Sequence, residues 1–236
     1  MSIASKKIEY LKSKEHFDFY DLCALVEALR SEEGCPWDRE QTNKSIRNAF
    51  IDETYEFIEG LDNDDNALMC EELGDVIFQI VFHACIKQET DEFNISDVID
   101  GICKKMILRH PHVFGDVSVS GSGEVLDNWE KIKNDEKQRK TPYERLASIS
   151  KALPSLMRSA KLQAKSEKYG LCEEQKTEDY TQKIADCLAL LNSGKGDKNT
   201  VSELLFASAG AARTLGFEPE EILYEQNELF LKKFQE

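Results

Sequence analysis

The strongest constraint on the fold comes from residues 45–86, which predict two helices joined by a short turn. Apolar side chains recur every three or four residues on both sides of a polar turn at residues 62–66, and this period is typical of amphipathic helices. A connection of that length makes the two helices antiparallel neighbours. Side chains at comparable distances from the turn are therefore expected to lie opposite each other.

Four carboxylates occupy this hairpin at helical spacing. Glu53 and Glu56 lie three residues apart in the first helix, and Glu72 and Asp75 lie three apart in the second. Each pair thus projects from one side of its helix, and the turn brings the two pairs opposite each other. Facing carboxylates inside a protein persist when protons, cationic side chains or a metal ion neutralise them. We expect these four acids to bind a cation.

The second helix of the hairpin is apolar around nearly its whole circumference, and such a helix is normally buried. What remains polar is a narrow stripe of Glu72, Asp75, Gln79 and His83. For a single carboxylate in so acidic a chain, solvation or a salt bridge is the simpler explanation. Clustering of four acids on two neighbouring helices favours a metal site.

The rest of the chain also predicts helices. The 236 residues include 5 Pro and 12 Gly, and the apolar residues keep the helical period almost everywhere, so the fold is expected to be all-α. Further helices are predicted at about 19–31, 94–109 and 124–140. The length fits one large or two small domains. We place a boundary near Thr141, between a domain at 19–140 and a second at 150–236.

Composition excludes several classes of function. A net charge of −15 argues against a nucleic-acid partner, because binding a polyanion depends on clustered Lys and Arg. There is no apolar run long enough to span a membrane, and the first 20 residues are too charged for a signal peptide, so a cytoplasmic location is expected. The seven cysteines show no C-x-x-C pair and are interpreted as reduced packing residues.

Two cations and a tryptophan are candidate substrate contacts. Lys105 and Arg109 lie four residues apart at the end of the helix predicted at 94–109. Cations at a helix C-terminus are ordinary, since the helix dipole favours them, but in a protein with a cluster of metal-binding acids they are also candidates to clamp phosphate oxygens. Trp37 follows a Gly-Cys-Pro break after the first helix. It either covers the mouth of a pocket or is a buried structural tryptophan.

The second half of the chain is similar to the first, which suggests an internal duplication. Residues 202–207 match 74–79, and residues 219–233 match 96–109. The acids do not recur as a set. The positions of Glu53, Glu56, Glu72 and Asp75 are taken in the second half by Cys187, Leu190, Thr200 and Glu203. The metal site is therefore expected in the first half alone.

The motifs together resemble those of the MazG nucleoside triphosphate pyrophosphohydrolases. The signature is E-E-x-x-E followed by E-x-x-D, here with Asp52 in place of the first Glu. It is preceded by E-G-C-P-W-D-x-x-Q-T at residues 33–42 and followed by R-H-P-H-V-F at 109–114 and N-W-x-x-I-K at 128–133. The match is strong over about 19–140 and weaker over 150–236.

This resemblance implies MazG-like helical bundles that two chains complete by pairing, so a homodimer is expected. It also implies hydrolysis of nucleoside triphosphates (NTP or dNTP) to the monophosphate and pyrophosphate. Carried over by motif, Glu53, Glu56, Glu72 and Asp75 are the metal ligands. Lys105 and Arg109 match phosphate-binding positions, Trp129 matches a nucleotide-contacting tryptophan, and Lys133 belongs to the same motif.

The ligand chemistry points to the same type of site without the family name. Ligands that are all oxygens suit a hard cation such as Mg²⁺ or Mn²⁺, which bridges substrate phosphates. The proton acceptor for the attacking water is expected to be Glu53 or Asp52, and the residues do not decide between them. A di-iron oxidase is disfavoured because its Glu-x-x-His ligands are missing at this spacing. A non-catalytic nucleotide-sensing or protein-binding scaffold is the remaining alternative.

Overall fold

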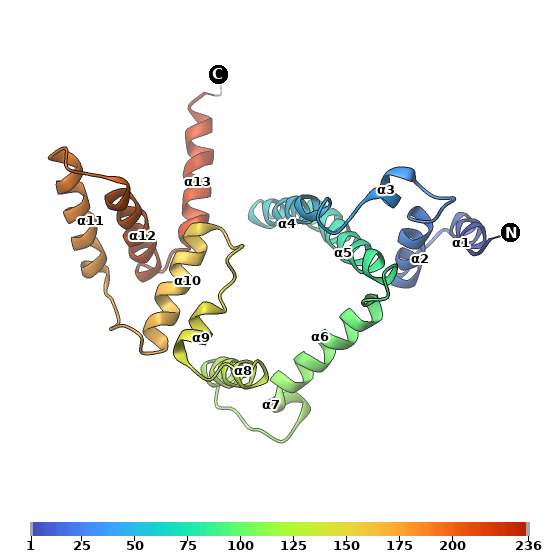
Figure 1. Cartoon of the computed structure of the whole chain (residues 1–236), viewed down its shortest axis with the longest axis horizontal. Coiled ribbons are helices and arrows are strands. Elements are labelled where there is room, and N and C mark those ends of the chain that lie inside the picture. The colour runs from blue at the N-terminus through green and yellow to red at the C-terminus, as the bar shows by residue number, and fades with distance from the viewer. Residues whose placement is uncertain (1, 235–236) are drawn as a thin grey trace. The chain divides into compact units, whose positions relative to one another are not determined.

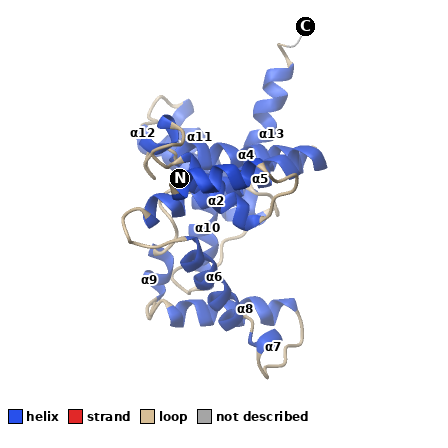
Figure 2. Cartoon of the chain, turned by 90° about the vertical axis from the view of Figure 1, so that its right-hand side faces the viewer, coloured by secondary structure: helices blue, strands red, loops and turns tan. Residues whose placement is uncertain are grey.

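The structure is a computed structural model that describes residues 2–234, and every regular element within that range is a helix (Figures 1 and 2). The prediction of an all-α fold is confirmed. The first seven helices are α1 (Ile3–Lys12), α2 (Phe19–Leu29), α3 (Pro36–Glu40), α4 (Arg47–Asp62), α5 (Asn66–Gln88), α6 (Ile95–Arg109) and α7 (Pro111–Phe114). The other six are α8 (Ser122–Glu136), α9 (Pro142–Ala147), α10 (Ser155–Lys168), α11 (Thr177–Asn192), α12 (Lys198–Thr214) and α13 (Pro219–Lys232).

Within residues 2–234, no helix is both long enough and apolar enough to cross a membrane.

The chain divides into two compact units, Met1–Val117 and Ser118–Glu236. This division reflects which helices contact one another, and it assigns α8 to the second unit. The domain boundary near Thr141 was placed where a charged helix leads into a linker, and it stays a prediction.

The core of the first unit lies where α2 packs against α5. Val26 of α2 meets Val81, Phe82 and Cys85 of α5, and Ile46, just before α4, closes the cluster. Helix α2 begins at Asp18, whose side chain accepts hydrogen bonds from backbone amides of the first turn, a cap typically worth about 1 kcal/mol.

Helix α1 was not among the sequence predictions. None of its residues is buried, and it is held to α2 by an ion pair of Lys7 with Glu27 and by one of Lys14, just after α1, with Asp21. The sequence signal was weak because none of the residues of α1 is buried, so the helix has no continuous apolar stripe facing the core.

The prediction that α5 is buried around its circumference is wrong. Leu73, Ile77 and Ile80 are 45%, 42% and 37% exposed, whereas two residues of the polar stripe, Glu72 and Gln79, are buried. Helix α6 is similarly open: its exposed apolar residues are Val98, Ile99, Ile102, Ile107 and Leu108. The inference went wrong because periodicity identifies apolar faces but does not say whether the same chain covers them.

The second unit is built around α11 and α12, which pack along each other as α4 and α5 do in the first unit. Its core contains Tyr180, Ala207 and Ala211. Gly210 allows the close approach, since a Cβ atom there would lie 2.3 Å from the Tyr180 ring. Helix α8 is tied to α10 by ion pairs from Lys165 and Lys168 to Glu130.

The cysteines of the described residues are all free, as predicted. Cys85 and Cys187 are buried and serve as packing residues. Cys70, Cys103 and Cys172 are exposed, so the packing role predicted for them is wrong.

Candidate metal centre

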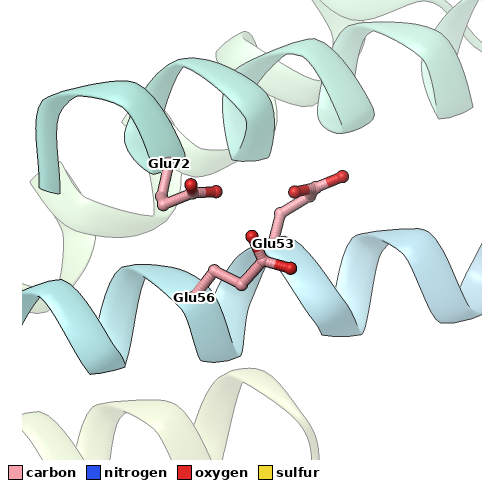
Figure 3. A group of neighbouring side chains, drawn as sticks. All are labelled: Glu53, Glu56 and Glu72. Carbon is pink, nitrogen blue, oxygen red and sulfur yellow. The ribbon is translucent and has the colours of Figure 1, made fainter. Parts of the chain in front are cut away.

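Three of the four predicted ligands converge between α4 and α5. Glu53 and Glu56 project from α4 and Glu72 projects from α5, and all three reach into the space between the two helices (Figure 3). Each offers a carboxylate oxygen within 4.8 Å of the oxygens of the other two. The helical spacing and the short turn, held by the Asp65 cap of α5, produce this convergence.

Burial and the neighbouring acids raise the pKa values of two carboxylates of the cluster, Glu53 and Glu72. Burial raises the pKa of Glu72, and the charges of Glu56 and Asp75 raise it further. The pKa of Glu53 is raised by burial first and then by Asp75 and Glu56, while a hydrogen bond from Gln79 opposes the shift. Like charges this close disfavour full ionisation of the group.

Glu72 is the clearest sign that the cluster is built for a cation. Its side chain is buried, at 5% exposure, and its Oε2 atom has no hydrogen-bond partner. A buried carboxylate oxygen without a partner carries a desolvation cost that a cation would offset. The donor set is entirely oxygen, which matches the preference of Mg²⁺ and Mn²⁺. The residues present therefore fit a divalent metal ion.

Asp75 and Asp52 lie outside the tight group of three. Asp75 is exposed, yet its charge acts on both Glu53 and Glu72, so it borders the cluster. Asp52 is also exposed, and its charge is the last and smallest of those raising the pKa of Glu53. Their roles as ligand and as proton acceptor stay predictions.

The five predicted substrate contacts belong to three helices, of which α3 and α6 lie in the first unit and α8 in the second. Helix α6 leaves the C-terminal end of α5 and runs away from the α4–α5 pair (Figure 1), with Lys105 and the buried Arg109 in its last turns. Trp37 is 63% exposed on α3, so the alternative of a buried structural tryptophan is wrong. Trp129 and Lys133 belong to α8 of the second unit, where the Lys133 ammonium lies 4.8 Å from the Trp129 ring centroid.

Sequence reasoning missed a hydrogen-bonded pair further along α5. The amide Nδ2 of Asn43, in the loop before α4, donates to the carbonyl oxygen of His83 at 3.0 Å and contacts its Nδ1 at 2.8 Å. Burial lowers the pKa of His83, and its ring packs edge-on against Phe50 at 5.8 Å. His83 was recognised as part of the polar stripe, but nothing in the sequence linked it to a residue 40 positions earlier.

The same loop is fastened by Arg30, which sequence reasoning also missed. Arg30 is buried, and its guanidinium binds the carboxylate of Glu89 through two nitrogens, at 2.6 and 2.7 Å. It also donates to the backbone carbonyls of Asp38 and Gln41. This clamp joins the end of α2 and the end of α5 to the loop that carries Asn43.

The second unit has a different arrangement at the positions that match the acids. Thr200 is buried, and its hydroxyl donates to Asp197 at 2.8 Å. Cys187, Leu190 and Glu203 line an open pocket of about 820 Å³. Near it, Arg213 pairs with Glu167 at 2.7 Å, and the Glu167 side chain is 10% exposed, so this largely covered acid is neutralised by the chain itself.

Comparison with known proteins agrees with this geometry. The family model described as the MazG nucleotide pyrophosphohydrolase domain matches residues 41–114, which contain α4, α5 and all four acids. A protein of Thermotoga maritima named nucleoside triphosphate pyrophosphohydrolase/pyrophosphatase MazG is 37% identical, over 92% of this chain and 84% of its own length. The chain belongs to the MazG family.

Other relatives extend the match over both units of this MazG family member. A nucleoside triphosphate pyrophosphohydrolase of Escherichia coli is 35% identical, over 91% of this chain and 85% of its own length. An uncharacterised protein of Bacillus subtilis, YabN, is 38% identical over 93% of this chain, which spans 46% of that protein. The resemblance stated from motifs is thus confirmed.

Proposed function

We propose that this protein hydrolyses nucleoside triphosphates to the monophosphate and pyrophosphate, with Mg²⁺ bound between α4 and α5. Membership of the MazG family and the names of its relatives support the reaction. The observation that carries the proposal is the convergence of Glu53, Glu56 and Glu72, with a buried, unpartnered oxygen on Glu72. Mn²⁺ meets the same requirements for ligands and would substitute for Mg²⁺.

The acids of the hairpin have separate tasks in this proposal. Glu53, Glu56, Glu72 and Asp75 would hold the metal ion, which when bound would supply positive charge for the triphosphate and activate water. Of the two candidate proton acceptors, Glu53 is favoured over Asp52. Its pKa is raised by burial and neighbouring acids, which makes it a stronger base, whereas Asp52 is exposed.

Phosphate binding requires cations that the α4–α5 pair does not itself provide. Lys105 and Arg109 remain the proposed phosphate clamp, and Trp129, Lys133 and Trp37 the proposed nucleotide contacts. Because α6 runs away from the acids (Figure 1), the clamp is proposed to come from the α6 helix of a second copy of the chain. Cations that approach from outside the cluster would neutralise charge that develops on the phosphates.

A homodimer is supported by the apolar surface of the first unit. Leu73, Ile77 and Ile80 on α5, and five apolar residues of α6, are exposed in the single chain. Contiguous apolar surface of this kind marks interaction sites. We propose that pairing of two copies covers these faces, and that the second unit is a degenerate duplicate of the first. The expected location is the cytoplasm.

The experiment that tests the reaction is product analysis with the purified protein, Mg²⁺ and the four common NTPs and their deoxy forms. The expected products are pyrophosphate and the nucleoside monophosphate. Release of orthophosphate with a nucleoside diphosphate would contradict the proposed bond cleavage. A Glu203→Gln protein serves as the matched control, since Glu203 occupies the position of Asp75 in the second unit.

A further inference from the structure

The polar stripe of α5 continues beyond the acids toward a second group of polar residues. Asp75, Gln79 and His83 follow one another at four-residue intervals, so their side chains lie on one side of the helix. At 1.5 Å per residue, His83 is about 12 Å along the axis from Asp75. In the other direction, α5 begins after a turn that contains Asp64 and Asp65 and follows Asp62, the last residue of α4.

The two directions differ in the ligand that they suit. The turn carries only acids and amides and would repel the anionic parts of a nucleotide. The His83 end offers amides, an imidazole and the half-buried ring of Phe50. A nucleobase is planar and neutral, and it presents hydrogen-bond donors and acceptors on its edge, so the His83 end is the chemically matched one.

The hydrogen bonds of Asn43 determine which groups this end can offer. The backbone oxygen of His83 can only accept, so the Asn43 atom 3.0 Å from it is the amide nitrogen. The same nitrogen lies 2.8 Å from Nδ1 of His83, so Nδ1 accepts and Nε2 carries the proton of the neutral ring. This leaves the Nε2–H of His83 as a donor and the Oδ1 of Asn43 as an acceptor.

The loop that carries Asn43 is held in place by hydrogen bonds. Arg30 binds the carbonyls of Asp38 and Gln41 and is itself anchored by Glu89. Asn43 therefore stands in a fixed position relative to α5, and a donor and an acceptor that are held in place can discriminate between partners. Both Asn43 and His83 are half-buried, so a ligand can still reach them.

We propose that Asn43 and His83 form a nucleobase subsite, in which the Nε2–H of His83 and the Oδ1 of Asn43 bind the base edge beside the ring of Phe50. This inference rests on the proposed function and names the residues that set its base preference. The triphosphate then lies toward Glu53, Glu56 and Glu72, and the nucleoside lies along Gln79 toward His83.

The test compares kcat/KM for ATP, GTP, CTP and UTP between the unaltered protein and two variants. His83→Asn keeps an acceptor near the position of Nδ1 for Asn43 but removes the outward donor, and Asn43→Ala removes the acceptor. We expect the ratios among the four substrates to change by about 5-fold, as for the loss of one hydrogen bond. His16→Asn, on an exposed loop, is the control and should leave the ratios unchanged.

A structural role alone would lower kcat/KM by the same factor for all four nucleotides, and that result would overturn the proposal. Binding of the four nucleoside monophosphates in EDTA, measured by calorimetry, gives a readout without metal or turnover, and the same change of ratios is expected there.

If a variant fails to fold, an experiment on the unaltered protein still tests the subsite. Ribose 5-triphosphate, which lacks a base, should be hydrolysed with a kcat/KM lower by about 10-fold or more. Equal rates would overturn the subsite, whereas no pyrophosphate from any NTP would instead reject the proposed function.

Discussion

The two units of the chain treat a buried carboxylate in opposite ways. In the second unit, Glu167 is paired with Arg213 at 2.7 Å and also contacts the hydroxyl of the buried Tyr180. In the first unit, Glu72 is more deeply buried, at 5% exposure, but its Oε2 has no partner and its nearest charges are other acids. The second unit balances its buried charge within the chain, and the first leaves it to be balanced by a cation from solution.

This difference shows how a unit without the acid cluster avoids the need for a cation. At the position that matches Glu72, the second unit has Thr200, whose hydroxyl donates to Asp197, the N-cap residue of its own helix. No external ion is then needed. An uncompensated buried charge is tolerated where binding of a ligand repays its cost, so the cluster of the first unit is expected to be functional rather than a packing feature.

The largest expected effect comes from removing one acid of the first unit. Glu72→Gln keeps the volume of the side chain but removes its charge, and pyrophosphate release should fall by about 10³-fold or more, since loss of a single well-placed electrostatic group already costs 10²–10³. The helical circular dichroism should be unchanged. Retained turnover in this variant would contradict the claim that the acid cluster of the first unit is the active centre.

The next largest effect concerns stability of the second unit. Arg213→Met leaves the largely covered Glu167 without its charged partner, and the free energy of unfolding should fall by about 2 kcal/mol. This is less than the 3–5 kcal/mol typical of fully buried pairs, because the Arg213 side chain is 22% exposed. Urea unfolding, with hydrogen exchange to separate the two units, measures the loss. The matched change Glu72→Gln should not lower stability of the metal-free protein.

The pH dependence of stability should have opposite signs in the two units. The raised pKa values of Glu53 and Glu72 stabilise the metal-free first unit below about pH 4.5, and this contribution is lost as pH rises through the raised values. In the second unit, hydrogen bonds from Lys165, Lys168 and Tyr169 outweigh the effect of burial and lower the pKa of Glu130 to about 2.

The Glu130 contribution is therefore present above about pH 4.5 and is lost as pH falls toward 2. Hydrogen exchange of the metal-free protein between pH 4 and 7 should show protection of α4 and α5 decreasing as pH rises. Glu72→Gln should flatten that trend. A trend of the same sign in α8 and α10 would contradict the contrast between the units.

The smallest expected effect is that of Glu203→Gln. Glu203 lines the pocket of the second unit at the position of Asp75, but no cluster of carboxylates surrounds it in the described residues. Pyrophosphate release should stay within about 2-fold of the unaltered protein, as for a surface substitution. A loss comparable to that of Glu72→Gln would move the active centre to the second unit.

The sequence predicted the contacts that depend only on helical spacing and on the length of one short turn. The spacing of Glu53 and Glu56 and the length of the turn were sufficient to predict that they meet Glu72, because helical geometry alone fixes those positions. The contact between Asn43 and His83 depends on the path of a loop clamped by Arg30, and no local pattern encodes that path. Exposure of Leu73 and Ile77 could not be predicted either, since periodicity does not identify the partner that covers a face.

Metal binding to the two units tests the central claim most directly. Titration of the protein with Mn²⁺, followed by electron paramagnetic resonance of the free ion, should show binding that Glu203→Gln leaves intact. The same titration should show that binding is weakened at least 10-fold in Glu72→Gln and abolished when Glu53, Glu56 and Glu72 are all changed to Gln. Equal Mn²⁺ binding by the unaltered protein and this triple variant would contradict the account.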